Sequence, residues 1–371
     1  MRSDIMKSIM RISLFAGWTI AGLAVGAAMA AEPPAKPPVT DDGTMTTVSF
    51  DLPFSSFASE AARESFVQRL RAPMSRGGAD IAAVRRGTDE KLLPQLEHMK
   101  SLYPTKSSKS VIAGVPVETF EPVAGIAPDN RERVLIELHG GGFVAGGGGP
   151  GGAIESVPIA AEARIKVIAV DYRMAPEHRF PAASEDVAAV YRELLKTYRP
   201  ENIGIFGCSA GGLLAAQSIP WFLKEKLPLP GAVGVFCASL HTFAEGDSAQ
   251  LWTRMGSVIP VVPPAQPEDS FGRSLPYLAG ASTRDPLAVP AASKDVLKQF
   301  PPTIFVTGTR APEMSGAAQS HLDLSELGVK SELYLFDGLD HGFFSDAKFP
   351  ESRLAFRLIA RFFNEHLGAR R

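Results

Sequence analysis

The sequence has few cysteines, no excess of basic residues and no internal repeat, which excludes several classes of protein. It holds only two cysteines in 371 residues, which excludes the disulfide framework that staples small secreted domains. Its formal net charge is -2, so it lacks the basic excess that binding to a nucleic acid backbone requires. No segment recurs with a period of about 20 to 50 residues, so a repeat architecture is not indicated. Nucleic acid is therefore not an expected partner, and stability must come from an apolar core.

Motifs for metals and phosphates are also missing. The chain has no H-E-x-x-H pair, no paired-cysteine zinc spacing and no G-x-x-x-x-G-K-[ST] loop. The two cysteines, Cys208 and Cys237, lie 29 positions apart in the numbering, and whether they bridge is a question of geometry that the sequence leaves open. We therefore expect a protein that requires no metal or organic cofactor.

The N-terminus has the layout of a secretory signal. Three basic residues precede an uncharged stretch from Ile12 to Ala31, which ends in the small-residue run Ala28-Met29-Ala30. Residues 1–30 are the expected signal peptide and 31–45 a proline-rich linker, so a periplasmic or secreted protein is predicted. An apolar stretch of about 20 residues can also span a bilayer, and an uncleaved membrane anchor is the alternative.

From residue 115 onward, short apolar runs alternate with helical stretches. Continuous apolar runs are typical of strands that are covered on both faces of a parallel sheet. The alternation predicts an α/β fold with a mostly parallel central sheet and helices on both faces. The expected strands are residues 115–120, 134–138, 167–170, 203–206, 233–236, 303–307 and 332–336, and the expected helices 184–197, 212–224, 317–327 and 351–367.

Two regions of the expected domain, residues 46–371, fall outside this alternation. Amphipathic helical stretches occupy residues 58–70 and 88–102, before the first expected strand. Residues 239–300 are rich in proline and glycine and contain no expected strand. We expect contributions from about 55–105 and 239–300 to form a cap or lid over a pocket, although residues 239–300 also fit an ordinary long surface loop.

The pentapeptide Gly207-Cys208-Ser209-Ala210-Gly211 follows an apolar strand and opens an apolar helix. This is the required context of a G-x-S-x-G nucleophile elbow, in which glycines leave room for a sharp turn. The turn exposes the Ser209 hydroxyl, and the helix N-terminus favours developing negative charge. Ser209 is therefore the predicted nucleophile, with a tight structural turn as the alternative.

Upstream, an apolar strand leads into His139-Gly140-Gly141-Gly142-Phe143. Acyl transfer passes through a tetrahedral oxyanion that preorganised donors must hold. We assign these donors to the backbone amides of Gly141, Gly142 and Ala210.

The same glycine run formally matches a dinucleotide fingerprint, with Asp171 placed for a ribose. This alternative is weak because glycines continue through 146–152, where the phosphate-binding helix should begin. It also explains neither the elbow nor the downstream histidine.

A general base and an acid complete the expected constellation. His341 follows the last expected strand, where this arrangement places its base. Chain order predicts an acid between Ser209 and His341 that fixes the histidine tautomer. Glu313 is the only carboxylate in the loop 308–313 and is the predicted acid. The remaining candidates are Asp323, Asp337 and Asp340.

Three segments together resemble the hormone-sensitive-lipase-like esterases, or bacterial type IV esterases, of the α/β-hydrolase superfamily. They are residues 139–143, residues 171–182 with the sequence DYRMAPEHRFPA, and residues 207–212. The resemblance runs from about residue 108 to the C-terminus and implies an α/β-hydrolase fold and hydrolysis of carboxylic esters. It also implies that residues 171–182 brace the site without reacting.

The chain departs from the family pattern at two places. Cys208 stands where most members have an aspartate before the nucleophile, and Ala311-Pro312-Glu313 stands where the family usually has Asp-Pro-Leu. The expected carboxylate has thus moved two residues along, onto a longer side chain. The predicted activity is ester hydrolysis of a small molecule through an acyl-enzyme; an amide, a lactone or an acetylated sugar would use the same groups. A catalytically silent binding protein on this fold is the alternative from another class.

Overall fold

The structure is a computed structural model that describes residues 39–41, 43–46, 51–71, 80–255 and 275–368. The expected signal peptide and most of the expected linker lie outside these residues. The chain divides into two compact units, residues 1–53 and 54–371. In the first, Val39 and Met45 form an isolated antiparallel bridge. Every described helix and strand belongs to the second, and none of these helices combines the length and apolar character needed to cross a membrane.

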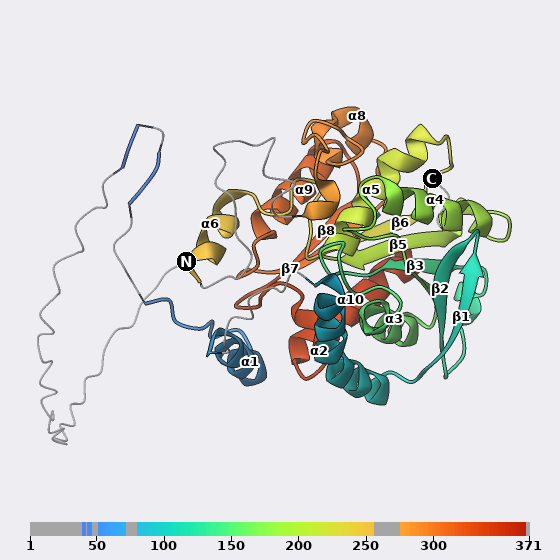
Figure 1. Cartoon of the computed structure of the whole chain (residues 1–371), viewed down its shortest axis with the longest axis horizontal. Helices are drawn as coiled ribbons and strands as arrows, with labels where there is room; N and C mark the ends of the chain where they lie inside the picture. Colours follow the sequence, from blue (N-terminus) through green and yellow to red (C-terminus); the bar gives the residue numbers. More distant parts are fainter. Residues whose placement is uncertain (1–38, 42, 47–50, 72–79, 256–274, 369–371) are drawn as a thin grey trace, which may run out of the picture. The chain divides into compact units, whose positions relative to one another are not determined.

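An eight-stranded sheet forms the centre of the second unit (Figure 1). Its strands are β1 (Thr105–Ile112), β2 (Val115–Pro122), β3 (Val134–Leu138), β4 (Lys166–Val170), β5 (Ile203–Cys208), β6 (Ala232–Phe236), β7 (Thr303–Gly308) and β8 (Ser331–Phe336). They lie in the order β1-β2-β4-β3-β5-β6-β7-β8. The pairs from β4 to β8 are parallel, whereas β2 is antiparallel to both β1 and β4. The mostly parallel sheet expected from the sequence is confirmed.

Strand β1 has no counterpart among the expected strands. Its six central residues are exposed, so no apolar run marks it in the sequence. It forms by pairing with β2 across a two-residue turn, Ala113-Gly114, in which both residues have positive φ. That backbone is the type I′ hairpin turn, whose twist matches the flanking strands. At the sheet edge, backbone pairing with β2 thus forms a strand whose exposed residues carry no apolar run.

Helices cover both faces of the sheet and enclose two apolar cores. On one face lie α2 (Ile81–Leu102), α3 (Pro150–Ala163) and α10 (Pro350–His366). On the other lie α4 (Ala182–Leu194), α5 (Ala210–Lys224) and α9 (Met314–Glu326). Figure 1 shows these two layers below and above the strands. The four helices expected after residue 180 are thus present, and the prediction of helices on both faces is confirmed.

Helix α3 corrects the interpretation of the glycine run. The sequence suggested that glycines through residue 152 prevent a helix, but α3 begins at Pro150, with Gly149 as its N-cap. Proline suits the first helical position because its φ is already helical. A Cβ on Gly152 would lie 3.1 Å from Ala169 Cβ, so close packing on the sheet selects glycine there. The nucleophile elbow and the downstream histidine, which a dinucleotide site does not explain, are the features against that alternative.

The two regions expected to form a cap contain α-helices, and one of these helices is α2. Helix α1 (Glu60–Arg71) and helix α2 precede the sheet, and α6 (Gly246–Arg254) and α8 (Lys294–Leu297) lie between β6 and β7. The described part of that interruption, residues 237–255 and 275–302, contains no strand. Part of the expected insertion, residues 256–274, lies outside the described residues.

Core packing at Phe206 provides a test of this architecture. The ring is fully buried on β5 and lies 5.8 Å from the rings of both Phe236 and Phe363. Phe206→Ala should lower the free energy of unfolding by about 3–5 kcal/mol, measured by urea denaturation. Phe57 is 88% exposed, so Phe57→Ala should change it by less than about 0.5 kcal/mol. Equal effects of the two substitutions would contradict the packing described.

Candidate active site

Ser209 occupies the turn between β5 and α5. Its φ of 59° and ψ of -121° place it in a region that side chains rarely adopt, at a cost of about 1–3 kcal/mol. The neighbouring glycines have a direct steric reason. A Cβ on Gly207 would lie 2.2 Å from the carbonyl oxygen of Leu138, and one on Gly211 would lie 1.7 Å from it. The end of β3 therefore passes too close for any other residue at these positions.

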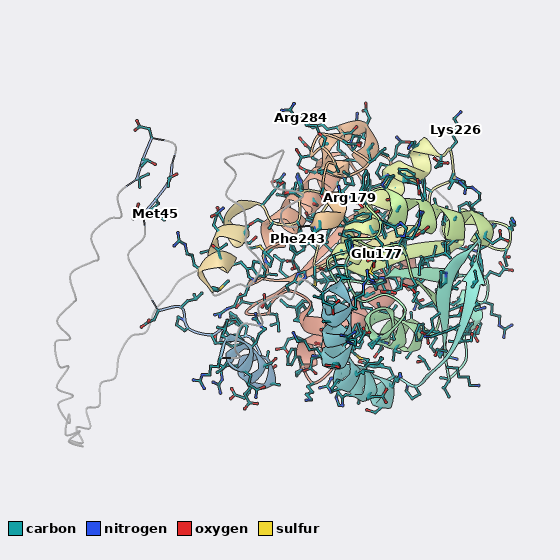
Figure 2. All side chains as sticks on the ribbon, in the orientation of Figure 1. Met45, Glu177, Arg179, Lys226, Phe243 and Arg284 are labelled. Atoms are coloured by element: carbon teal, nitrogen blue, oxygen red, sulfur yellow. The ribbon has the colours of Figure 1, made fainter. Side chains whose placement is uncertain are left out.

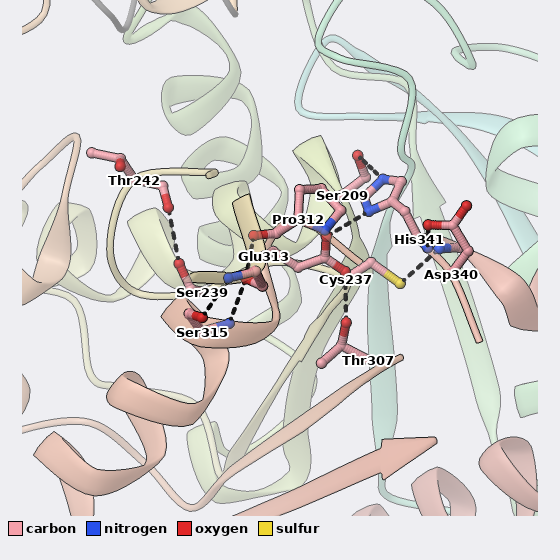
Figure 3. A network of polar contacts seen from close by, with 12 residues as sticks. Ser209, Cys237, Ser239, Thr242, Thr307, Pro312, Glu313, Ser315, Asp340 and His341 are labelled. Atoms are coloured by element: carbon pink, nitrogen blue, oxygen red, sulfur yellow. Dashed lines mark hydrogen bonds and ion pairs between the residues drawn. The ribbon is translucent and has the colours of Figure 1, made fainter. Parts of the chain in front are cut away.

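His341 lies beside this turn, in the loop between β8 and α10. Its Nε2 is 3.0 Å from Ser209 Oγ, although the two residues are 132 positions apart (Figure 3). The imidazole is 21% exposed, so it contacts solvent on one side. The structure thus brings the predicted nucleophile and the predicted base to hydrogen-bond distance.

Glu313 approaches the other side of the His341 ring. Its Oε2 lies 3.0 Å from His341 Nδ1, and its Oε1 accepts a hydrogen bond of 2.6 Å from the Thr307 hydroxyl. The carboxylate is fully buried. An ionised carboxylate can only accept a hydrogen bond, so Nδ1 of His341 must carry the proton. In the neutral ring, Nε2 is then an acceptor for the Ser209 hydroxyl. The contacts therefore fix the tautomer that a general base needs.

The surroundings of His341 act on its pKa in opposite directions. Burial lowers the pKa, but the carboxylate of Glu313 raises it by charge and by hydrogen bonding, with smaller contributions from Cys237 and Asp340. The net result is a pKa above the ordinary value of about 6.5. Glu313 therefore stabilises the imidazolium that forms when His341 accepts a proton.

The other candidate acids have different partners. Asp323 contacts His241 at 2.9 Å. Asp337 accepts hydrogen bonds from Ser55 and Thr309. Asp340 accepts from the backbone amide of His341 at 2.7 Å and pairs with Arg69. Among the residues that the structure describes, Glu313 is thus the carboxylate that contacts the His341 ring.

At the position where the family usually has its acid, this chain has an alanine, which has no carboxylate. Ala311 is fully buried, in the loop between β7 and α9. Glu313 follows two residues later and forms the N-cap of α9. Its longer side chain reaches His341 from there, as the contact distance shows.

The glycine loop lies against the nucleophile. Gly141 and Gly142 have φ values of 109° and 64°, and a Cβ on Gly140 would lie 3.5 Å from Ser209 Cβ. Ala210 is the first residue of α5, directly after Ser209. Within the described ranges of the chain, the amides of Gly141, Gly142 and Ala210 donate no backbone hydrogen bond. These amides are therefore free to bind an oxygen of a ligand.

Residues 171–182 brace this loop through hydrogen bonds. The Tyr172 hydroxyl donates to the carbonyl oxygen of His139 at 2.6 Å. The backbone amide of Ala175 donates to the carbonyl oxygen of Phe143 at 2.8 Å. Arg85 of α2 binds the carboxylate of Glu177, which Figure 2 labels. Both ends of the glycine loop are thus tied to the segment expected to support it.

The two cysteines are buried beside the site and are not bridged. Burial, with the neighbouring Cys237, raises the pKa of the Cys208 thiol well above its ordinary value, so Cys208 is held as a neutral thiol. Cys237 Sγ accepts a hydrogen bond from the amide of Gly342 at 3.2 Å. Cys237, Glu313 and His341 have ligand atoms within 4.8 Å of one another, but the Glu313 carboxylate already binds His341 and Thr307.

A pocket of about 270 Å³ opens beside His341. Its walls include Phe66 of α1, Gln95 of α2 and Trp252 of α6, besides the loop that carries His341. Phe243, labelled in Figure 2, packs edge-on against the His341 ring at 5.4 Å. Both regions expected to form a cap thus contribute to the surroundings of His341.

Sequence reasoning missed three residues that hold the site together, namely Thr307, Cys237 and Phe243. Thr307 lies near the end of β7, and its hydroxyl orients Glu313. A hydroxyl residue at the carboxyl end of a buried strand is the sequence signal that could have identified Thr307. Cys237 and Phe243 lie after β6, in a region that no motif marks.

A family model described as the alpha/beta hydrolase fold matches residues 135–345, more than half of the chain. An acetyl-hydrolase of Streptomyces hygroscopicus is 33% identical over 178 residues, which are 48% of this chain and 56% of that protein. The chain thus spans only about half the length of that relative. The esterase LipU of Mycobacterium tuberculosis is 26% identical over 278 residues, which cover 72% of this chain and 90% of that protein.

Solved structures of esterases are similar over most of the chain. A crystal structure of an esterase has a TM-score of 0.73 and 29% identity, and the match covers 87% of this chain and 99% of that one. An esterase from the bacterial hormone-sensitive lipase family has a TM-score of 0.68 and 27% identity, with 84% and 100% covered. The resemblance that the sequence motifs indicated is confirmed.

The contact between Glu313 and His341 makes a prediction about proton affinity. In Glu313→Gln, a neutral amide replaces the carboxylate that stabilises the imidazolium, while burial still disfavours the charge. The pKa of His341 should therefore fall below its wild-type value, as measured by NMR titration of the ring protons. An unchanged pKa would mean that Glu313 does not act on this histidine.

Proposed function

The chain belongs to the α/β-hydrolase fold family, and we propose that it hydrolyses carboxylic esters through an acyl-enzyme intermediate on Ser209. The single observation that carries the proposal is the continuous chain of hydrogen bonds from Ser209 Oγ through His341 to the buried Glu313. A hydroxyl, an imidazole and a carboxylate in this order form the constellation that activates a serine for acyl transfer.

In the acylation step, His341 Nε2 takes the proton of the Ser209 hydroxyl as Oγ attacks the ester carbonyl. The carbonyl oxygen becomes an oxyanion, and the amides of Gly141, Gly142 and Ala210 are its proposed donors. Glu313 stabilises the imidazolium and keeps Nε2 directed at the reacting atoms. The tetrahedral intermediate then collapses, and His341 protonates the departing alcohol.

In the deacylation step, water replaces the alcohol beside the acyl-enzyme. His341 Nε2 takes a proton from this water, which attacks the acyl carbonyl and forms a second oxyanion at the same amides. Collapse of this intermediate returns the proton to Ser209 Oγ and releases the carboxylic acid. Each cycle thus regenerates the neutral histidine and the free serine.

A short acyl group is the proposed preference. One relative is named an acetyl-hydrolase and another a versiconal hemiacetal acetate esterase.

A panel of p-nitrophenyl esters from acetate to palmitate tests the activity. We expect turnover of acetate and butyrate, with kcat/KM falling for longer chains. Ser209→Ala is the control, because it removes the nucleophile and leaves the fold in place. Turnover that does not exceed that of Ser209→Ala would favour the alternative of a catalytically silent binding protein.

The identity of the acid has its own test. Glu313→Gln should lower kcat by about 10⁴-fold, the loss that follows the corresponding change in a serine protease. Asp323→Asn is a matched control, because Asp323 contacts His241 rather than His341, and it should retain wild-type kcat. Near wild-type activity in Glu313→Gln would mean that another carboxylate acts as the acid beside His341.

Export to the periplasm or the medium is proposed from the N-terminal segment. Cleavage after the run that ends at Ala30 would give a mature protein that begins near Ala31. Mass spectrometry of the protein from a host with a general secretion system should find this N-terminus in the soluble exported fraction. Intact Met1 in the membrane fraction would instead support the uncleaved anchor.

A further inference from the structure

Helix α9 begins at the acid of the proposed triad, but the side chain of this acid does not cap the helix. Glu313 is the N-cap residue of α9, and its carboxylate makes no capping hydrogen bond. The carboxylate binds His341 and Thr307 instead. The first amides of a helix have no partner within the helix, and an N-cap side chain usually accepts from one of them. The first turn of α9 therefore needs an acceptor from another part of the chain.

Ser248 of α6 supplies this acceptor. Its Oγ accepts a hydrogen bond of 2.9 Å from the backbone amide of Ser315, the second residue of α9. The same hydroxyl donates to the carbonyl oxygen of Pro312 at 2.8 Å. Pro312 directly precedes Glu313, and Ser315 follows it by two positions, as their labels in Figure 3 allow the reader to trace. One hydroxyl thus binds the backbone on both sides of the acid.

The contact between the two helices is reciprocal. Glu245 is the N-cap residue of α6, and its side chain also makes no capping hydrogen bond; it accepts from the Thr242 hydroxyl instead. Ser315 Oγ accepts a hydrogen bond of 3.0 Å from the amide of Ser248, the third residue of α6. A Cβ on Gly246 would lie only 2.7 Å from Ser315 Cβ. Two closely packed helix ends are thus each capped by a serine of the other helix.

Burial makes the Ser248 hydroxyl hard to replace. The residue is only 2% exposed, so water has little access to the groups that it binds. Without this hydroxyl, the amide of Ser315 would lack an acceptor, and a polar group that is buried without a partner is costly. The carboxylate nearest to this amide in the sequence belongs to Glu313, and a carboxylate is a favourable acceptor at a helix N-terminus. Ser248 therefore removes a competing role for the Glu313 side chain.

We propose that Ser248 is a positioning residue of the triad, because its hydroxyl caps α9 and leaves the Glu313 carboxylate free to bind His341. Its expected effect on turnover rests on the proposed function, whereas its effect on the contact between Glu313 and His341 does not. The same helix carries Trp252 in the wall of the pocket beside His341. Helix α6 thus contributes both to the pocket and to the orientation of the acid.

The proton affinity of His341 tests the proposal without any turnover. Burial lowers the pKa of His341, but the carboxylate of Glu313 raises it. In Ser248→Ala the contact with the carboxylate should loosen, so the pKa should fall. NMR titration of the ring protons in the full-length protein should show a proton affinity at least about threefold lower than in the wild type.

Ser320→Ala is the matched control. Ser320 is also a buried serine of α9, and its hydroxyl accepts from the amide of Leu240 at 2.9 Å and donates to the carbonyl oxygen of Gly316 at 2.7 Å. These partners do not flank Glu313. Ser320→Ala should therefore destabilise the fold in the same way but leave the pKa of His341 unchanged.

Turnover of p-nitrophenyl acetate gives a second readout. The kcat of Ser248→Ala should fall at least about tenfold, because misplacing a group by about 1 Å can cost about 100-fold. KM should change by less than about twofold, since Ser248 does not line the pocket beside His341. In a Glu313→Gln background, Ser248→Ala should lower kcat little further, because a residue that acts through Glu313 then has no carboxylate to position.

Ser248→Cys serves if the alanine variant does not fold, since a thiol keeps the shape but is a weak donor and acceptor, and it should change both readouts in the same direction. An unchanged pKa of His341 in a folded Ser248 variant would overturn the proposal. So would an equal fall in Ser320→Ala, or a full additional loss of kcat in the Glu313→Gln background. If the wild type hydrolyses no ester but the pKa falls as expected, the proposed function fails and the positioning role stands.

Discussion

The strained, positive-φ backbone at Ser209 is the constraint on which the rest of the site depends. Only this conformation lifts Oγ out of the end of β5 and starts α5 in the very next residue. It is possible because Gly207 and Gly211 allow the carbonyl of Leu138 to pass closer than any Cβ would permit. The strained turn thus sets the direction of the hydroxyl and the position of the Ala210 amide together. The surrounding parallel strands hold it in place.

Two hydrogen bonds allow the carboxylate of Glu313 to be fully buried. A carboxylate without water is stable only when its oxygens accept hydrogen bonds, and Glu313 receives one from Thr307 and one from His341. Its charge has no solvent to screen it, so it acts strongly on the imidazole. Glu313 makes both contacts from a position two residues after Ala311, where the family usually has its aspartate.

Much of the fold and the site could be predicted from the sequence, because the signals are local. The elbow is a contiguous pentapeptide between an apolar strand and an apolar helix, and His341 follows the last strand directly. The positions of Ser209, His341 and Glu313 relative to one another follow from strand order, since the carboxyl ends of parallel strands meet at one edge.

The features that sequence reasoning missed depend on tertiary contacts. Strand β1 has no apolar run and exists through pairing with β2. Helix α3 begins among glycines because the sheet needs small residues at that contact, which overrides their low helix propensity. Thr307 gains its role only through its hydrogen bond to Glu313, six residues later in the chain.

Covalent labelling tests the central claim, that Ser209 is the nucleophile, most directly. A fluorophosphonate reacts with an activated serine and mimics the tetrahedral intermediate. The account predicts one stoichiometric adduct, which peptide fragmentation assigns to Ser209 rather than to the adjacent Cys208. An adduct on Cys208 or on another residue, or no adduct at a correctly folded protein, would contradict it.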